Sequence, residues 1–252
     1  MEIREFKDLN ISGIGQTDYT YCRVRTPPRG HEMKKRGFGL IIGISIVLIG
    51  GLLGRLLWQP DPTELVKHGL ERLNAATSFR YSLTQHQWVE GKDRVLTQVI
   101  GEKDGVNTRI LGQMTGSEVE MIKMGDSTYS KDPFSKKWIR FANALAAQEV
   151  FLAELNPLSS LQMKELGEVM LSDQGKVNGE KVWVCQLSPS VQNQMMEAFW
   201  TDFKYTLYIR KSDKMIVKAT IEAKNKVKND PMTMTLEFKD IGKKINIQAP
   251  DI

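Results

Sequence analysis

Apolar and polar side chains alternate along several stretches of the chain after residue 77. The alternation is clearest near the end, where four apolar residues are separated by Thr233, Thr235 and Glu237: Met232, Met234, Leu236 and Phe238. Three other stretches repeat it, with these apolar positions: Phe79, Tyr81, Leu83; Phe203, Tyr205, Leu207, Ile209; and Met215, Val217, Ala219, Ile221. Successive side chains of a strand point to opposite faces, so the pattern predicts strands with one dry and one wet face.

Turn-forming pairs separate these stretches, which predicts a chain of hairpins. The pairs are Glu90-Gly91, Asp104-Gly105, Gly125-Asp126, Asn178-Gly179 and Ser212-Asp213. Asn178-Gly179 is the best candidate for a two-residue type I′ turn, because both of its residues tolerate positive φ. Short strands joined in this way are typical of an antiparallel sheet.

Helical spacing predicts three helices. The first covers residues 62–76, where Asp61 caps, Pro62 takes the first helical position and Leu65, Val66, Gly69, Leu70 and Leu73 form one stripe. The second spans Ala146–Leu166, broken at Asn156-Pro157, and the third spans Pro189–Trp200. The predicted fold class is α+β: a strongly curved antiparallel sheet, a half-open barrel, with helices on its concave face.

A run without charged residues, Phe38 to Gly54, follows the basic cluster Lys34-Lys35-Arg36. Extended to Trp58 it is 21 residues long, about 31 Å as a helix, which matches the bilayer core. We expect a transmembrane anchor at 38–58, a disordered cytoplasmic tail at 1–37 and an extracytoplasmic domain at 59–252, because basic residues flank the anchor mainly on its N-terminal side.

Two alternatives to this organisation stay open. A cleaved secretory signal also has a basic start and an apolar stretch, although an Ala-x-Ala-like cleavage site is missing here. Residues 1–32 are also open to interpretation as a mis-assigned upstream start, because Met33 and its basic neighbours resemble the start of an exported protein.

The charge of the chain limits the kinds of partner that we expect, and the positions of its cysteines limit disulfide pairing. Nine of the 35 basic and five of the 30 acidic residues fall within 1–58, so the predicted outer domain carries a net charge of only +1. We therefore expect no nucleic-acid partner. Cys22 and Cys185 fall on opposite sides of the predicted membrane and are not expected to pair, and the apolar strand pattern around Cys185 predicts that it is buried.

The order of elements resembles the LolA/LppX-type lipoprotein-carrier superfamily. The resemblance spans about residues 62–252 and includes the closing Phe238-Lys239-Asp240-Ile241-Gly242 with Ile245-x-Ile247-x-x-Pro250. It implies a half-open barrel with an apolar cavity that is plugged by helices and receives the acyl chains of a lipid or lipoprotein. It also implies binding rather than bond-breaking.

Within such a cavity, apolar residues from the sheet and the last helix are the candidate ligand contacts. They are Phe79, Tyr81, Leu83, Met195, Met196, Phe199, Trp200, Tyr205, Leu207, Met234 and Leu236. Twelve methionines favour an adaptable site, since Met side chains are flexible and polarisable. Ordinary core packing is the competing interpretation for each residue alone. We expect Met195, Met196, Phe199 and Trp200 to be the stronger candidates, as parts of a lid.

Two functions remain in competition. The first is a membrane-anchored protein that binds lipid or lipoprotein acyl chains at its own membrane. The second is an RseB-like sensor or regulatory ectodomain whose partner is an envelope protein.

No enzyme, cofactor or metal site is predicted. The sequence has no Gly-x-Ser-x-Gly, Ser-x-x-Lys or His-Glu-x-x-His motif and no phosphate-binding glycine loop. His68 and His86 fall on the polar sides of their elements. Glu118 and Glu120 alternate with Val119 and Met121, which favours a wet sheet face over acid-base chemistry.

Overall fold

The computed structural model describes residues 59–142 and 155–251 of the chain. The predicted anchor at 38–58 and the tail before it lie outside these residues. Within the described ranges, no helix is both long and apolar enough to cross a bilayer.

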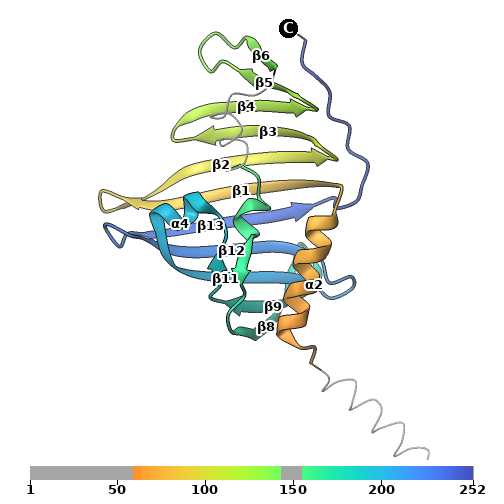
Figure 1. Ribbon diagram of the computed structural model, residues 1–252, viewed down its shortest axis with the longest axis vertical. Helices are drawn as coiled ribbons and strands as arrows, with labels where there is room; N and C mark the ends of the chain where they lie inside the picture. The colour runs from red at the N-terminus through yellow and green to blue at the C-terminus, as the bar shows by residue number, and fades with distance from the viewer. Residues whose placement is uncertain (1–58, 143–154, 252) are drawn as a thin grey trace, which may run out of the picture. The chain divides into compact units, whose positions relative to one another are not determined.

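The described residues form a mainly antiparallel sheet with few helices (Figure 1). Before the undescribed stretch 143–154 the elements are α2 (Pro62–Ala75), β1 (Ser78–Val89), β2 (Lys92–Asp104), β3 (Asn107–Met114), β4 (Ser117–Met124), β5 (Ser127–Lys131) and β6 (Trp138–Ala142). After it come the 3₁₀ turn η1 (Ser159–Leu161), β7 (Met163–Glu165), β8 (Val169–Val177), β9 (Glu180–Leu187), β10 (Ser190–Val191), α4 (Gln194–Phe199), β11 (Trp200–Arg210), β12 (Ile216–Asn225) and β13 (Pro231–Lys239).

Eleven of these strands make one sheet in the order β6-β5-β4-β3-β2-β1-β13-β12-β11-β9-β8, and β7 pairs separately with β10. Most neighbours in the sheet are also neighbours in sequence, which confirms the predicted chain of hairpins. The β1–β13 pair joins the two halves, with Tyr81 opposite Phe238. The sheet is open, because β6 and β8 are its two ends.

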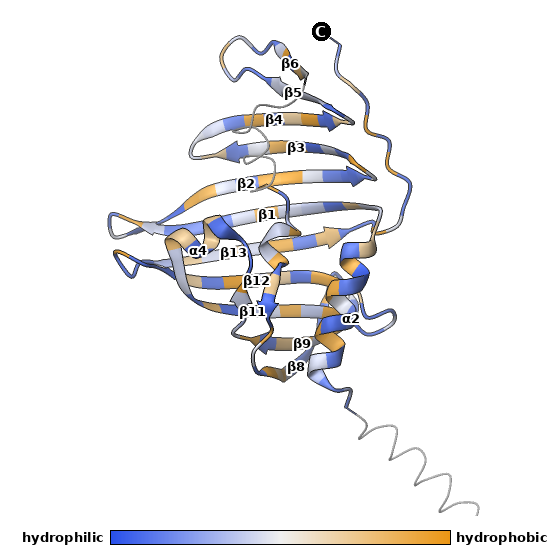
Figure 2. Ribbon diagram, in the orientation of Figure 1, coloured by the Kyte–Doolittle hydropathy of each residue, from blue (hydrophilic) through white to orange (hydrophobic). Residues whose placement is uncertain are grey.

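Hydrophobic and hydrophilic residues alternate along several strands (Figure 2), and this alternation decides which side chains face the core. In β13 the four apolar residues are buried and the residues between them are only partly buried. We call the face that carries Tyr81, Leu207 and Leu236 the covered face, because α2, α4 and residues 155–165 lie on it (Figure 1). The opposite face, with Arg80 and Ile100, is the open face.

Local signals at turns and caps are confirmed. Asn178 and Gly179 link β8 to β9 with φ of 50° and 83°, as a type I′ turn requires. Asp61 Oδ1 accepts a hydrogen bond from Thr63 N (2.8 Å) at the start of α2. The stripe of α2 is buried at Leu65, Val66, Gly69 and Leu73.

The second and third predicted helices are wrong in large part. Of Ala146–Leu166, residues 146–154 lie outside the described chain, and the rest forms the single 3₁₀ turn η1 and the strand β7. Of Pro189–Trp200, only Gln194–Phe199 is helical, since Ser190 pairs with Glu165 in β10 and Trp200 already begins β11. The backbone N–H and C=O groups of β7 and β10 form hydrogen bonds between these two strands and not within helices, an outcome that the spacing of side chains does not reveal.

The predicted alternation from Met215 to Ile221 is also corrected. A register shift between β11 and β12 places Ile216 opposite Ile209 on the covered face. Val217 instead packs on the open face, in a small cluster with Val182 and Val184. One extra residue in a strand reverses the face of every side chain before it, which periodicity in a single strand cannot reveal.

The last residues run along the end of the sheet as an extended segment (Figure 1). Ser78 Oγ donates a hydrogen bond to the carbonyl of Lys243 (2.8 Å) at its start. Ile245 and Ile247 then pack on Ile122 and Tyr129, on the open face of β4 and β5. This segment therefore covers part of a face that the helices leave bare.

Candidate functional site

The covered face brings together most of the predicted site residues. Seven of them lie on the three strands β1, β11 and β13 and are each at most 7% exposed: Phe79, Tyr81, Leu83, Tyr205, Leu207, Met234 and Leu236. They belong to one apolar cluster, which is the main core of the domain. Their role as ligand contacts stays a prediction.

The other four predicted residues divide between the core and the surface. Met196 and Trp200 are buried in the same cluster, whereas Met195 and Phe199 on α4 are 42% and 54% exposed. The helix is six residues long, and Asn193 Oδ1 caps it by accepting a hydrogen bond from Met196 N (2.9 Å). A helix this short depends on tertiary contacts to persist.

Two tyrosines hold the crossing segment, which we define as residues 155–165, against the sheet. The hydroxyl of Tyr81 on β1 donates to the carbonyl of Leu155 (3.0 Å), and that of Tyr205 on β11 donates to the carbonyl of Ser160 (2.8 Å). Burial raises the pKa of both phenols, so both stay protonated and able to donate. The crossing segment thus spans the joint between the two halves of the sheet.

Polar contacts also tie α4 to its surroundings. Lys164 of the crossing segment forms an ion pair with Glu197 of α4 at 2.6 Å. Lys226, in the turn between β12 and β13, donates to the carbonyl of Glu197. The crossing segment and α4 therefore form a connected cover, and these linking bonds are exposed.

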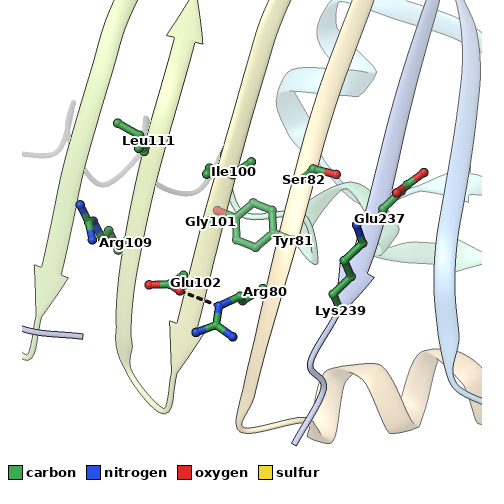
Figure 3. Close-up of a pocket in the computed structure, with 10 residues that line it drawn as sticks. All are labelled: Arg80, Tyr81, Ser82, Ile100, Gly101, Glu102, Arg109, Leu111, Glu237 and Lys239. Atoms are coloured by element: carbon green, nitrogen blue, oxygen red, sulfur yellow. Dashed lines mark hydrogen bonds and ion pairs between the residues drawn. The ribbon is translucent and has the colours of Figure 1, made fainter. Parts of the chain in front are cut away.

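A depression on the open face was not foreseen from the sequence. It has a volume of about 390 Å³ and lies across β13, β1, β2 and β3 (Figure 3). Its lining residues are Arg80, Tyr81, Ser82, Ile100, Gly101, Glu102, Arg109, Leu111, Glu237 and Lys239. A signal for it exists in the sequence, because Ile100 and Leu111 are apolar at positions where the alternation calls for polar residues.

Chemically reactive groups are sparse in the described chain. No three His, Cys, Asp or Glu side chains of residues 59–142 and 155–251 are placed to hold a metal ion. His68 and His86 are half exposed and lie near Glu71 (3.5 Å) and Asp93 (3.1 Å). Cys185 is buried, as predicted, and burial raises the pKa of its thiol to about 11, which makes it a poor nucleophile.

Comparison with known proteins identifies the type of fold. No protein-family model matches the chain, and no curated protein sequence matches it. Among solved structures, LprF from Mycobacterium bovis aligns with a TM-score of 0.50 at 12% identity, over 77% of this chain and 99% of that one. Lipoprotein LppX from Mycobacterium tuberculosis aligns with a TM-score of 0.47 at 12% identity, over 75% and 100%. The MucA/MucB complex of Pseudomonas aeruginosa aligns with a TM-score of 0.36 at 13% identity, over 73% and 56%. The open antiparallel sheet and its match to LprF identify the fold of this chain as the LolA/LppX-type fold.

Proposed function

We propose that the domain binds an acyl chain of a lipid or lipoprotein on the covered face, beneath the crossing segment and α4. The observation that carries the proposal is the nature of this cover. It consists of one 3₁₀ turn, a two-stranded ribbon and a six-residue helix, laid over a continuous apolar surface. Six of the twelve methionines lie in or against that apolar cluster, where flexible side chains can repack around a guest: Met114, Met163, Met196, Met215, Met232 and Met234.

Displacing the cover breaks the two tyrosine hydrogen bonds and uncovers its buried side chains Leu155, Leu161 and Val191. Each of the two tyrosine hydrogen bonds contributes about 1 kcal/mol net. Each methylene that leaves water contributes about 0.8 kcal/mol in the opposite direction. A chain of about ten buried methylenes would therefore offset both hydrogen bonds several times over. The guest must also replace the apolar contacts that the cover gives up, so a long acyl chain is favoured over a short one.

The location of this activity is part of the same proposal. Residues 38–58 would anchor the chain with the domain at the outer surface of its membrane. Acyl chains would then be taken from, or presented at, that membrane. The role is one of binding and not of catalysis.

The test is the lipid content of the full-length chain purified from its own host. We expect native mass spectrometry before and after delipidation to show a bound lipid of defined mass. Phe199→Asp should lower its occupancy, because a carboxylate at the exposed end of α4 disfavours an apolar guest. Phe134→Asp makes the same change at a side chain that is 92% exposed in the turn between β5 and β6, and should leave the occupancy unchanged.

Equal lipid content in the two variants, with folding retained, would remove α4 from the site. A chain that is purified without lipid and captures one particular envelope protein would instead support the regulatory ectodomain.

A further inference from the structure

Two apolar side chains stand uncovered in the middle of the open face. Ile100 of β2 and Leu111 of β3 are direct partners in the strand register, and they are 59% and 40% exposed. They lie on interior strands of the sheet, between β1 and β4, and not at an edge. The two side chains therefore form one small apolar patch and are not two scattered residues.

Two other apolar residues of the open face, on β4 and β5, are covered. Ile122 and Tyr129 lie beneath Ile245 and Ile247 of the C-terminal segment. The depression beside Ile100 has a volume of about 390 Å³, which is within the range of small-ligand sites.

The charges around the depression leave one cation without a partner. Arg80 pairs with Glu102 (2.7 Å) and Asp240 (2.9 Å), and Arg109 pairs with Glu120 (3.1 Å). Glu237, the other acid of the lining, pairs with Lys218 (3.2 Å). Lys239 is exposed and forms no ion pair with any residue of the described ranges. The charge left over at this site is positive.

The strand register separates this cation from the apolar pair. Lys239 lies opposite Arg80, which lies opposite Glu102, whereas Ile100 is two residues further along β2. At strand and residue spacings of about 4.8 Å and 3.4 Å, Lys239 is roughly 12 Å from Ile100. Ser82, opposite Ile100 and Glu237, lies between them. The site is thus apolar at one end and cationic at the other (Figure 3).

We infer that this depression binds an anionic amphiphile, with its hydrocarbon chain over Ile100 and Leu111 and its carboxylate or phosphate head on Lys239. A headless hydrocarbon would leave the cation unused, and a small anion would leave the apolar pair in water. The site is separate from the covered face, so it stands or falls independently of the proposed function. A fatty acid and a lysophospholipid share the required chemistry.

The test is photolabelling of the full-length chain in host membranes with three probes that carry the same diazirine in the same hydrocarbon chain. The probes are palmitic acid, lysophosphatidic acid and hexadecanol. We expect at least one anionic probe to label Ile100 or Leu111 about fivefold more than the alcohol does, the factor that one exposed ion pair supplies. The acid that labels more strongly identifies the head group.

Variants and neighbouring residues supply the controls. Lys239→Met should reduce labelling by the anionic probes to the level of the alcohol. Lys228→Met removes a lysine from the distant turn between β12 and β13 and should not change it. Val99 and Ile110 are on the same strands but face the core, so residue-level mass spectrometry separates the two faces.

Three results would overturn the inference. They are equal labelling by acid and alcohol, labelling by the acids that Lys239→Met leaves intact, and labelling confined to Val99 and Ile110. The last result would still agree with acyl binding on the covered face. Labelling of Ile100 with no bound lipid on the covered face would support this inference and contradict the proposed function.

Discussion

At the scale of single residues, Gly101 makes room for one of the bonds that hold the cover. The ring of Tyr81 lies across Gly101 on the neighbouring strand, so that a Cβ added there would come within 2.1 Å of Tyr81 Cζ. The hydroxyl of the same tyrosine reaches the carbonyl of Leu155. A glycine that weakens a strand locally therefore lets a distant segment attach to the sheet.

Gly101→Ala should destabilise the protein by about 2–4 kcal/mol, because the buried ring must leave its position and lose its hydrogen bond. Denaturant unfolding followed by tryptophan fluorescence measures this loss. Gly175→Ala is the matched control, since its Cβ would meet the nearest atom only at 3.9 Å, and we expect a change of no more than about 0.5 kcal/mol. Similar midpoints for the two variants would show that the Tyr81 ring adapts freely.

At the scale of strands, one carboxylate links three of them on the open face. Glu120 of β4 accepts hydrogen bonds from Arg109 of β3 (3.1 Å) and Lys131 of β5 (2.9 Å). Its side chain is 14% exposed. Burial acts to raise the pKa of Glu120, but the two cations outweigh it and the pKa lies below its usual value of 4.5.

This shift predicts the direction of a pH effect. The unfolded state takes up the proton first, so the stabilisation by Glu120 is complete above about pH 5 and is lost as the pH falls below 4.5 toward the folded-state pKa. Glu120→Gln should lower the free energy of unfolding at pH 7 by about 1 kcal/mol, since its partners are partly exposed, and flatten its dependence between pH 5 and 3. Glu118→Gln is the comparison: Glu118 of the same strand pairs with Lys136, and we expect a smaller effect because solvent screens that exposed pair. An unchanged slope in the Glu120 variant would contradict the assignment.

Elements were predictable where their signals are local. The cap at Asp61, the turn at Asn178-Gly179 and the alternation in β13 each depend on neighbouring residues. The region before β11 was misjudged because the apolar spacing of Val191, Met195, Met196 and Phe199 fits two structures. One is a single long helix, and the other is a short strand followed by a short helix. Pairing of β10 with β7 decided between them.

At the scale of the whole domain, the C-terminal segment acts as part of the core without belonging to the sheet. Ile245 is 3% exposed and Ile247 is 6% exposed, although neither is in a strand. They close a second apolar cluster on Ile122 and Tyr129, on the face opposite to the main core. The open face is thus covered by the C-terminal segment over β4 and β5 and has a depression across β13, β1, β2 and β3.

Ile245→Ser should destabilise the protein by about 2–3 kcal/mol, because it removes buried apolar contacts and leaves a hydroxyl without water. Thermal unfolding followed by circular dichroism measures the effect. Val227→Ser changes a side chain that is 87% exposed, and we expect it to behave as the unchanged protein does. If Ile245→Ser also had no effect, the C-terminal segment would be dispensable to the fold.

The candidate site was only partly predictable. Inward-facing residues of β1, β11 and β13 were assigned correctly to one apolar face, since period-two patterns report the facing of side chains. The tyrosine contacts to the crossing segment were not foreseen, because the groups that they join are 74 and 45 residues apart. The outward Ile100 and Leu111 were missed because each is a single break in its strand's alternation, and only the register places them side by side.

The sequence by itself determined the antiparallel hairpins, the first helix and the apolar face of the sheet, because these follow from backbone geometry repeated over a few residues. Tertiary structure decided which apolar stretches became strands, where β11 and β12 shift register, and what covers each face. Those outcomes depend on contacts between distant segments, whose free energies no local pattern records.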